Sequence, residues 1–188
     1  MSNGLRAVLL TLAIPGAMLA ADPLFESAWN KLERIESGQA KRGSVIVFTP
    51  AEINAWARGR VPQLLEGIRE PRVQLGTGAA TGSALVDFLK MRQGEGLATN
   101  PMIAKLIEGE RPLKVSVRLE SSDGHATAYL TGVELSGITV PRPVLDFLVK
   151  DFFLPLFPDA RINQPFELRD NIDRIDIRPD GVRVTIRK

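Results

Sequence analysis

The sequence predicts an α+β fold, a single domain in which a strongly curved, largely antiparallel sheet wraps around, or packs on, a long apolar helix. Segments with the 3.6-residue apolar spacing of helices alternate with segments typical of strands. The turn sequences Asp123-Gly124 and Pro179-Asp180-Gly181 each join two strand-like segments, as in antiparallel hairpins. A length of 188 residues suits one domain with a substantial core better than two.

The first third of the chain predicts two helices separated by a short strand. Residues 23–35 carry apolar side chains at helical spacing, with Asp22 as the N-cap. Residues 45–48 are a β-rich run. The sequence Thr49-Pro-Ala-Glu52 is a capping box, which opens a second helix that Gly59 and Pro62 bend or divide.

The remainder predicts mainly strands. Apolar and polar residues alternate over 113–119, which is typical of a strand with one buried and one wet face. The glycine-rich segment 76–82 is expected to connect two strands, and a short helix is expected over 101–107. The predicted strands cover residues 72–75, 83–90, 113–119, 126–135, 172–177 and 182–186.

Residues 143–157 predict a helix that is apolar over most of its circumference. The segment holds four of the eight phenylalanines of the chain, and Asp146 and Lys150 form its narrow polar stripe. A surface helix needs only one apolar face. Two interpretations remain open: a central core helix buried on two sides, or one wall of a cavity for an apolar ligand.

The N-terminus has the order of a secretory signal. Arg6 precedes an uncharged run over 7–21, which is broken at Pro15-Gly16 and ends in small residues. A membrane anchor or a buried helix is the alternative, but the run is shorter than the roughly 20 residues that span a bilayer. We expect a signal peptide over 1–20, a mature domain over 21–188, and a periplasmic or secreted protein.

Composition argues against most enzyme classes. The chain has no cysteine and one histidine, which excludes disulfides, thiolate zinc sites, cysteine nucleophiles and multi-histidine metal sites. The net charge of +2 is small and the basic residues are scattered, so we expect no nucleic-acid partner.

The remaining candidates for chemistry have simple structural explanations. His125 follows a turn and has no serine-elbow partner. The glycines of segment 76–82 precede a strand, where a nucleotide-binding loop requires a helix. Asp170, Asp173 and Asp176 alternate with arginines, which is typical of a solvated face. We therefore expect no catalytic residue, no metal site and no cofactor, although a hydrolase with unrecognised carboxylates remains an alternative.

The order of these elements resembles a family of small exported bacterial lipid-binding proteins. The resemblance rests on the helix start Thr49-Pro-Ala-Glu-Ile-Asn54, on the paired strands and hairpins between 73 and 135, and on Gly137-Ile-Thr-Val-Pro141, which leads into the apolar helix. These features are similar to TULIP (SMP-like) proteins, including the YceB-like lipoproteins and the LmeA-like phospholipid-binding proteins. The chain lacks the lipobox cysteine of the YceB-like members. The resemblance implies that lipid is held between a helix and a curved sheet.

The expected function is therefore non-enzymatic lipid binding or lipid shuttling, with a lipid or other apolar ligand as partner and contact with a membrane surface. The alternative is a structural or assembly domain of the envelope that docks a protein partner through the apolar helix. The expected ligand-binding residues fall into two groups, the apolar helix and an opposite rim: Phe147, Leu148, Phe152, Phe153, Leu156 and Phe157, with Ile53, Trp56, Leu64 and Leu65.

This expectation predicts that Phe152→Asp or Phe153→Asp abolishes lipid co-purification, because a carboxylate cannot be buried against an acyl chain without a large desolvation cost. Native mass spectrometry of the detergent-free protein measures the bound lipid, and circular dichroism verifies folding. Normal lipid recovery from a folded variant would exclude these residues from the site.

Overall fold

The computed structural model describes residues 22–91, 108–150 and 161–188. Helices α1 (Pro23–Glu36) and α2 (Pro50–Leu64) are three to four turns long, whereas α3 (Phe88–Met91) and α5 (Arg142–Leu148) are short. The strands are β1 (Val45–Phe48), β2 (Ile68–Leu75), β3 (Ala79–Asp87), β4 (Glu110–Ser122), β5 (His125–Leu135), β6 (Ile138–Thr139), β7 (Pro165–Glu167), β8 (Ile172–Arg178) and β9 (Gly181–Ile186).

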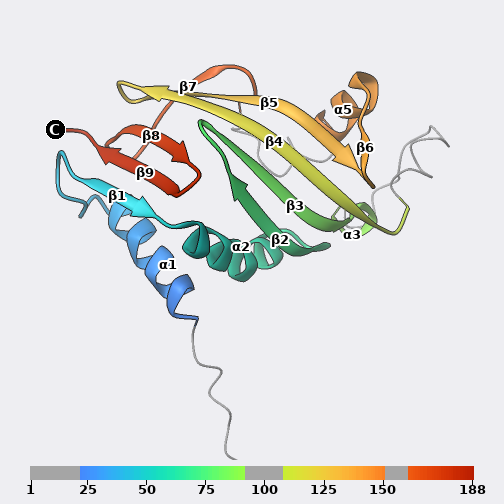
Figure 1. Cartoon of the computed structure of the whole chain (residues 1–188), viewed down its shortest axis with the longest axis horizontal. Helices are drawn as coiled ribbons and strands as arrows, with labels where there is room; N and C mark the ends of the chain where they lie inside the picture. Colours follow the sequence, from blue (N-terminus) through green and yellow to red (C-terminus); the bar gives the residue numbers. More distant parts are fainter. Residues whose placement is uncertain (1–21, 92–107, 151–160) are drawn as a thin grey trace, which may run out of the picture.

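The strands form two antiparallel sheets (Figure 1). The small sheet has the order β1-β9-β8, and the large sheet has the order β2-β3-β4-β5-β6, with β7 paired to β5. The predicted hairpin at Asp123-Gly124 is confirmed: both residues have positive φ, at 51° and 75°, as a tight type I′ turn requires. The predicted closing hairpin of β8 and β9 is confirmed as well.

The predicted architecture, in contrast, is wrong. The described residues contain no long apolar helix, and the large sheet is neither strongly curved nor closed. Of the helix predicted over 143–157, the structure describes only α5, and residues 151–157 lie outside the described ranges. The buried apolar residues that the structure describes form two separate cores instead of one core around a long helix. One lies under α5 at one end of the large sheet, and the other lies between the small sheet and α1 and α2.

Three element boundaries also differ from expectation. Helix α2 continues through Pro62 and ends two residues later, so this proline neither divides nor ends the helix at its own position. The connection between β2 and β3 is only 76–78, because residues 79–82 belong to β3. Residues 88–90 lie in α3 rather than at the end of a strand.

A buried carboxylate fixes the two long helices beside the small sheet. Glu52 is 4% exposed and accepts hydrogen bonds from Ser27 Oγ at 2.6 Å and Lys31 Nζ at 2.5 Å, both on α1. Its second oxygen accepts from the backbone N–H of Thr49 at 2.8 Å and from the Thr49 hydroxyl, which completes the predicted capping box. Burial raises the pKa of the Glu52 carboxyl, but these hydrogen bonds outweigh burial and lower it from 4.5 to about 2.

Asparagine residues bond backbone groups on both long sides of the large sheet. Asn54 on α2 accepts from Val73 N–H and donates to Val73 C=O, each at 2.8 Å, so at this position its amide takes the place of a neighbouring strand. On the opposite side, Asn163 Oδ1 accepts from Leu130 N–H, and the backbone N–H of Asn163 donates to Ala128 C=O. Unpaired strand edges invite association with other chains, and these bonds satisfy part of each edge.

Because the pKa of Glu52 is depressed, its contribution to stability is complete above pH 4.5 and is lost as the pH falls toward about 2. We expect Glu52→Gln to lower the free energy of unfolding by about 3 kcal/mol at pH 7 and to flatten its pH dependence between these limits. Urea unfolding of both proteins from pH 7 to pH 2 measures this. Parallel pH profiles would show that Glu52 is not the group whose protonation weakens the fold.

We expect Asn54→Leu to cost about 2 kcal/mol, because it leaves the N–H and C=O of Val73 without partners in a half-buried position. The matched control is Asn30→Leu, an exposed position on α1, which should cost less than about 0.5 kcal/mol. Thermal denaturation and sedimentation velocity measure both effects. An Asn54→Leu protein as stable and as monomeric as the control would contradict the role of Asn54 at the edge.

Candidate functional site

One face of the large sheet is lined by apolar residues in successive cross-strand rows, and we call it the apolar face. Apolar residues at every second position of β2, β3, β4 and β5 lie on the same side, because strand side chains alternate. The rows are Leu75, Ala80, Val117 and Leu130; then Val73, Gly82, Val115 and Val133; then Ala84, Leu113 and Leu135. The intervening residues, such as Gln74, Thr81 and Ser116, form the opposite, polar face.

A line of small residues follows β3 on the apolar face, and we call this line the furrow. In the three rows given above, β3 contributes only Ala80, Gly82 and Ala84, while Val86 lies further along the same strand. The adjacent strands contribute larger residues, with Val73 and Leu75 on one side and valines and leucines of β4 on the other. A Cβ built on Gly82 would meet no atom of the described residues within 4 Å, whereas Ala84 packs against the core under α5. Among the described residues, the furrow is therefore unoccupied at Gly82.

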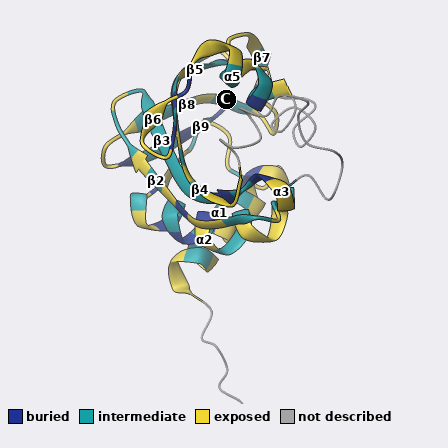
Figure 2. Cartoon of the chain, turned by 90° about the vertical axis from the view of Figure 1, so that its right-hand side faces the viewer, coloured by how far each residue is buried: buried dark blue, intermediate teal, exposed yellow. Residues whose placement is uncertain are grey.

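Burial is uneven along the apolar face. The buried members, Val86, Val133 and Leu135, lie toward one end of the sheet. Val73, Leu75 and their neighbours on β3 and β4 in the first two rows are half-buried. Figure 2 shows β3 and β4 mainly in the colours of half-buried and exposed residues. Burial of the apolar face among the described residues therefore decreases from the β5 side and the α5 end toward β2.

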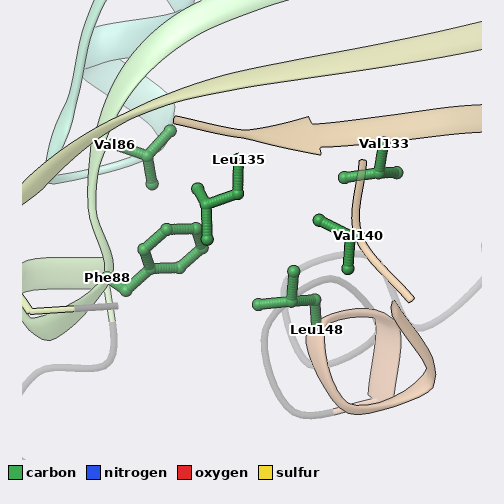
Figure 3. Close-up of a cluster of buried hydrophobic side chains, with 6 residues drawn as sticks. All are labelled: Val86, Phe88, Val133, Leu135, Val140 and Leu148. Atoms are coloured by element: carbon green, nitrogen blue, oxygen red, sulfur yellow. The ribbon is translucent and has the colours of Figure 1, made fainter. Parts of the chain in front are cut away.

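The buried end is closed by α5 and α3. Figure 3 shows the six buried side chains of this core between the sheet and α5, including Phe88 from α3 and Leu148 from α5. Leu148 is 7% exposed, and Phe147 packs against the same core. These two residues of the predicted site therefore adjoin the apolar face.

The other predicted site residues do not gather there. Ile53 and Trp56 pack against the second core, beside the small sheet. Leu64 is 57% exposed at the end of α2, and Leu65 is half-buried. Phe152, Phe153, Leu156 and Phe157 lie outside the described residues. Among the residues described, the two predicted groups thus belong to different cores and do not form opposite walls of one site.

The furrow was not found from the sequence. The three glycines in residues 76–82 predict a connection between strands rather than part of a strand. The signal that could have revealed it is the alternation of small apolar residues at positions 80, 82 and 84, which has the two-residue period of a strand.

The titratable residues singled out earlier stay dispersed. His125 is exposed, and its Nδ1 lies 3.0 Å from the carbonyl oxygen of Asp123. Asp176 pairs with Arg174 at 3.2 Å, while Asp170 occupies a turn with φ of 57°. Within the described ranges, no group of three or more histidine, aspartate or glutamate residues is arranged to hold a metal ion.

A shallow groove of about 360 Å³ lies on the polar face. It is lined by Arg72, Ser83, Lys114 and Glu134, with Glu70 at its rim. Lys114 and Glu134 already pair at 3.1 Å, and the charges lining the groove balance. The groove therefore has no net charge with which to select a charged ligand.

Comparison with known proteins identifies no relative: no family model, no curated protein and no solved structure matches the chain. Within the described ranges, no helix has the length and apolar character needed to span a membrane.

Proposed function

We propose that the protein is an exported, non-enzymatic lipid-binding or lipid-shuttling protein that holds an acyl chain in the furrow of its apolar face. The observation that carries this proposal is the line of small residues Ala80, Gly82 and Ala84 between larger apolar side chains, with no described atom within 4 Å of a Cβ at Gly82. The signal-like segment over 1–20 and the resemblance to exported lipid-binding families support export and lipid as the ligand class.

The shape and chemistry of the furrow suit an acyl chain better than a polar ligand. The residues that line it are apolar, and the polar residues next to them on the same strands, such as Gln74, Thr81 and Ser116, point to the opposite face. Dispersion and area burial need no directional partners. Each methylene moved from water contributes roughly 0.8 kcal/mol, so a partly covered furrow can hold a chain of ordinary length.

The α5 core closes one end of the apolar face. Phe147 and Leu148 pack at that end, together with Leu135. An acyl chain lying along β3 would reach this core at one end of the apolar face. Its headgroup would lie toward the opposite end of the face. The furrow thus binds a chain by its length and apolar character rather than by its headgroup.

The matched pair Gly82→Val and Gly132→Val tests the proposal. A Cβ at either glycine meets no atom of the described residues within 4 Å, but Gly82 lies on the apolar face and Gly132 on the polar face. Both substitutions introduce a β-branched residue into a central strand, so neither should lower strand propensity. Only Gly82→Val fills the furrow.

We expect the wild type and Gly132→Val to carry lipid after detergent-free purification, and Gly82→Val to carry at least tenfold less. Native mass spectrometry with organic extraction measures occupancy, and thermal denaturation verifies folding. Equal occupancy in both variants would place the lipid elsewhere. A lipid-free wild type that forms a stable complex with an envelope protein would instead favour the role of an assembly domain.

A further inference from the structure

The edges of the two sheets differ in how their backbone groups are satisfied. On β8, Ile177 C=O accepts from Gly78 N–H, and Ser121 Oγ bonds both the N–H and the C=O of Ile175, each at 2.8 Å. On β2, Asn54 bonds both backbone groups of Val73, and β6, β7 and Asn163 lie along β5. On the outer side of β1, in contrast, the described residues place neither a strand nor an asparagine side chain.

The register of β1 shows which of its backbone groups face outward. Ile186 N–H donates to Ser44 C=O, and Ile46 lies opposite Val184. In an antiparallel ladder, alternate residues bond the partner strand, so Val45 and Val47 direct their N–H and C=O groups away from β9. The Val47 carbonyl accepts from Lys31 Nζ at 2.8 Å. For the Val45 groups and the Val47 N–H, the described residues offer no partner.

The side chains at this edge are equally open. Val45 is 53% exposed and Val47 is 40% exposed, on the side of the small sheet away from the core. Ile46 and Phe48 point inward and are buried in the core with α1 and α2. The edge thus presents both free backbone groups and an apolar surface, which are the two elements that strand addition uses.

Cations flank this edge. Lys41 and Arg42 are exposed just before the strand, and the side chain of Lys188 lies beside Gly43. Lys31 lies at the other end, against the Val47 carbonyl and over the Phe48 ring. The charge of Lys31 is balanced by the buried carboxylate of Glu52, so Lys41, Arg42 and Lys188 supply the net positive charge at this edge. A second copy of this edge would bring like charges together, whereas an acidic segment would complement them.

We propose that β1 is a docking edge for an extended segment of a partner protein in which apolar and acidic residues alternate. The partner adds a strand beside β1 through the outward backbone groups of Val45 and Val47. Its apolar side chains lie beside these valines, and its acidic side chains meet the flanking lysine and arginine side chains. This site is separate from the furrow and does not depend on lipid binding.

A fluorescent ten-residue peptide of alternating valine and glutamate tests the proposal by anisotropy. We expect binding to the full mature protein, at least tenfold weaker binding to Val45→Pro, and unchanged binding to Val45→Thr. Proline removes an N–H that faces away from β9, so the bonds between β1 and β9 are retained. Threonine keeps both the N–H and the branched shape.

Three outcomes would overturn the proposal: no binding, equal binding to Val45→Pro, or equal binding of a valine–lysine peptide. A wild-type dimer that Val45→Pro dissociates would also overturn it, by assigning the edge to a second copy. If Val45→Pro fails to fold, hydrogen exchange on the unmodified protein tests strand addition instead. The amides of Val45 and Val47 should become protected when the valine–glutamate peptide is added, and unchanged exchange there would contradict strand addition.

Discussion

The arrangement of the helices around the small sheet depends on the buried carboxylate of Glu52. An ionised carboxylate removed from water is stable only when donors surround it. Here the donors come from two places in the chain, Ser27 and Lys31 on α1 and Thr49 at the start of α2. One charge therefore fixes the start of α2 and the position of α1 against it. Because Lys31 also reaches the Val47 carbonyl, β1 is held to the same unit.

The same helix connects the two sheets. Two residues beyond Glu52, the amide of Asn54 bonds both backbone groups of Val73, so α2 ends the large sheet while its other residues pack on the small one. Thr49, Glu52 and Asn54 thus link α1, β1 and β2 within six residues of sequence. Among the described residues, α2 thus holds the large sheet at its β2 edge, and α5 packs at one end of the apolar face.

Interactions between neighbouring residues were predictable from the sequence, whereas contacts between residues far apart in the sequence were not. The capping box at Thr49 and the turn at Asp123-Gly124 each involve neighbouring residues, and both are confirmed. Asn54 looked like an ordinary helix residue because its partner, Val73, lies 19 positions away. Likewise, Trp56 and Phe147 are both apolar helix residues in the sequence, and only the fold shows that they belong to different cores.

The furrow also shows why side-chain size matters more than apolar content. The prediction of a long apolar helix counted phenylalanines, but the furrow is lined by small residues on β3. A valine at position 82 would have a higher strand propensity than glycine, and its Cβ would meet no described atom within 4 Å. Glycine at this position weakens the strand slightly, and no described atom near its Cβ position requires it. The acyl chain that we propose for the furrow would give this weak position a physical purpose.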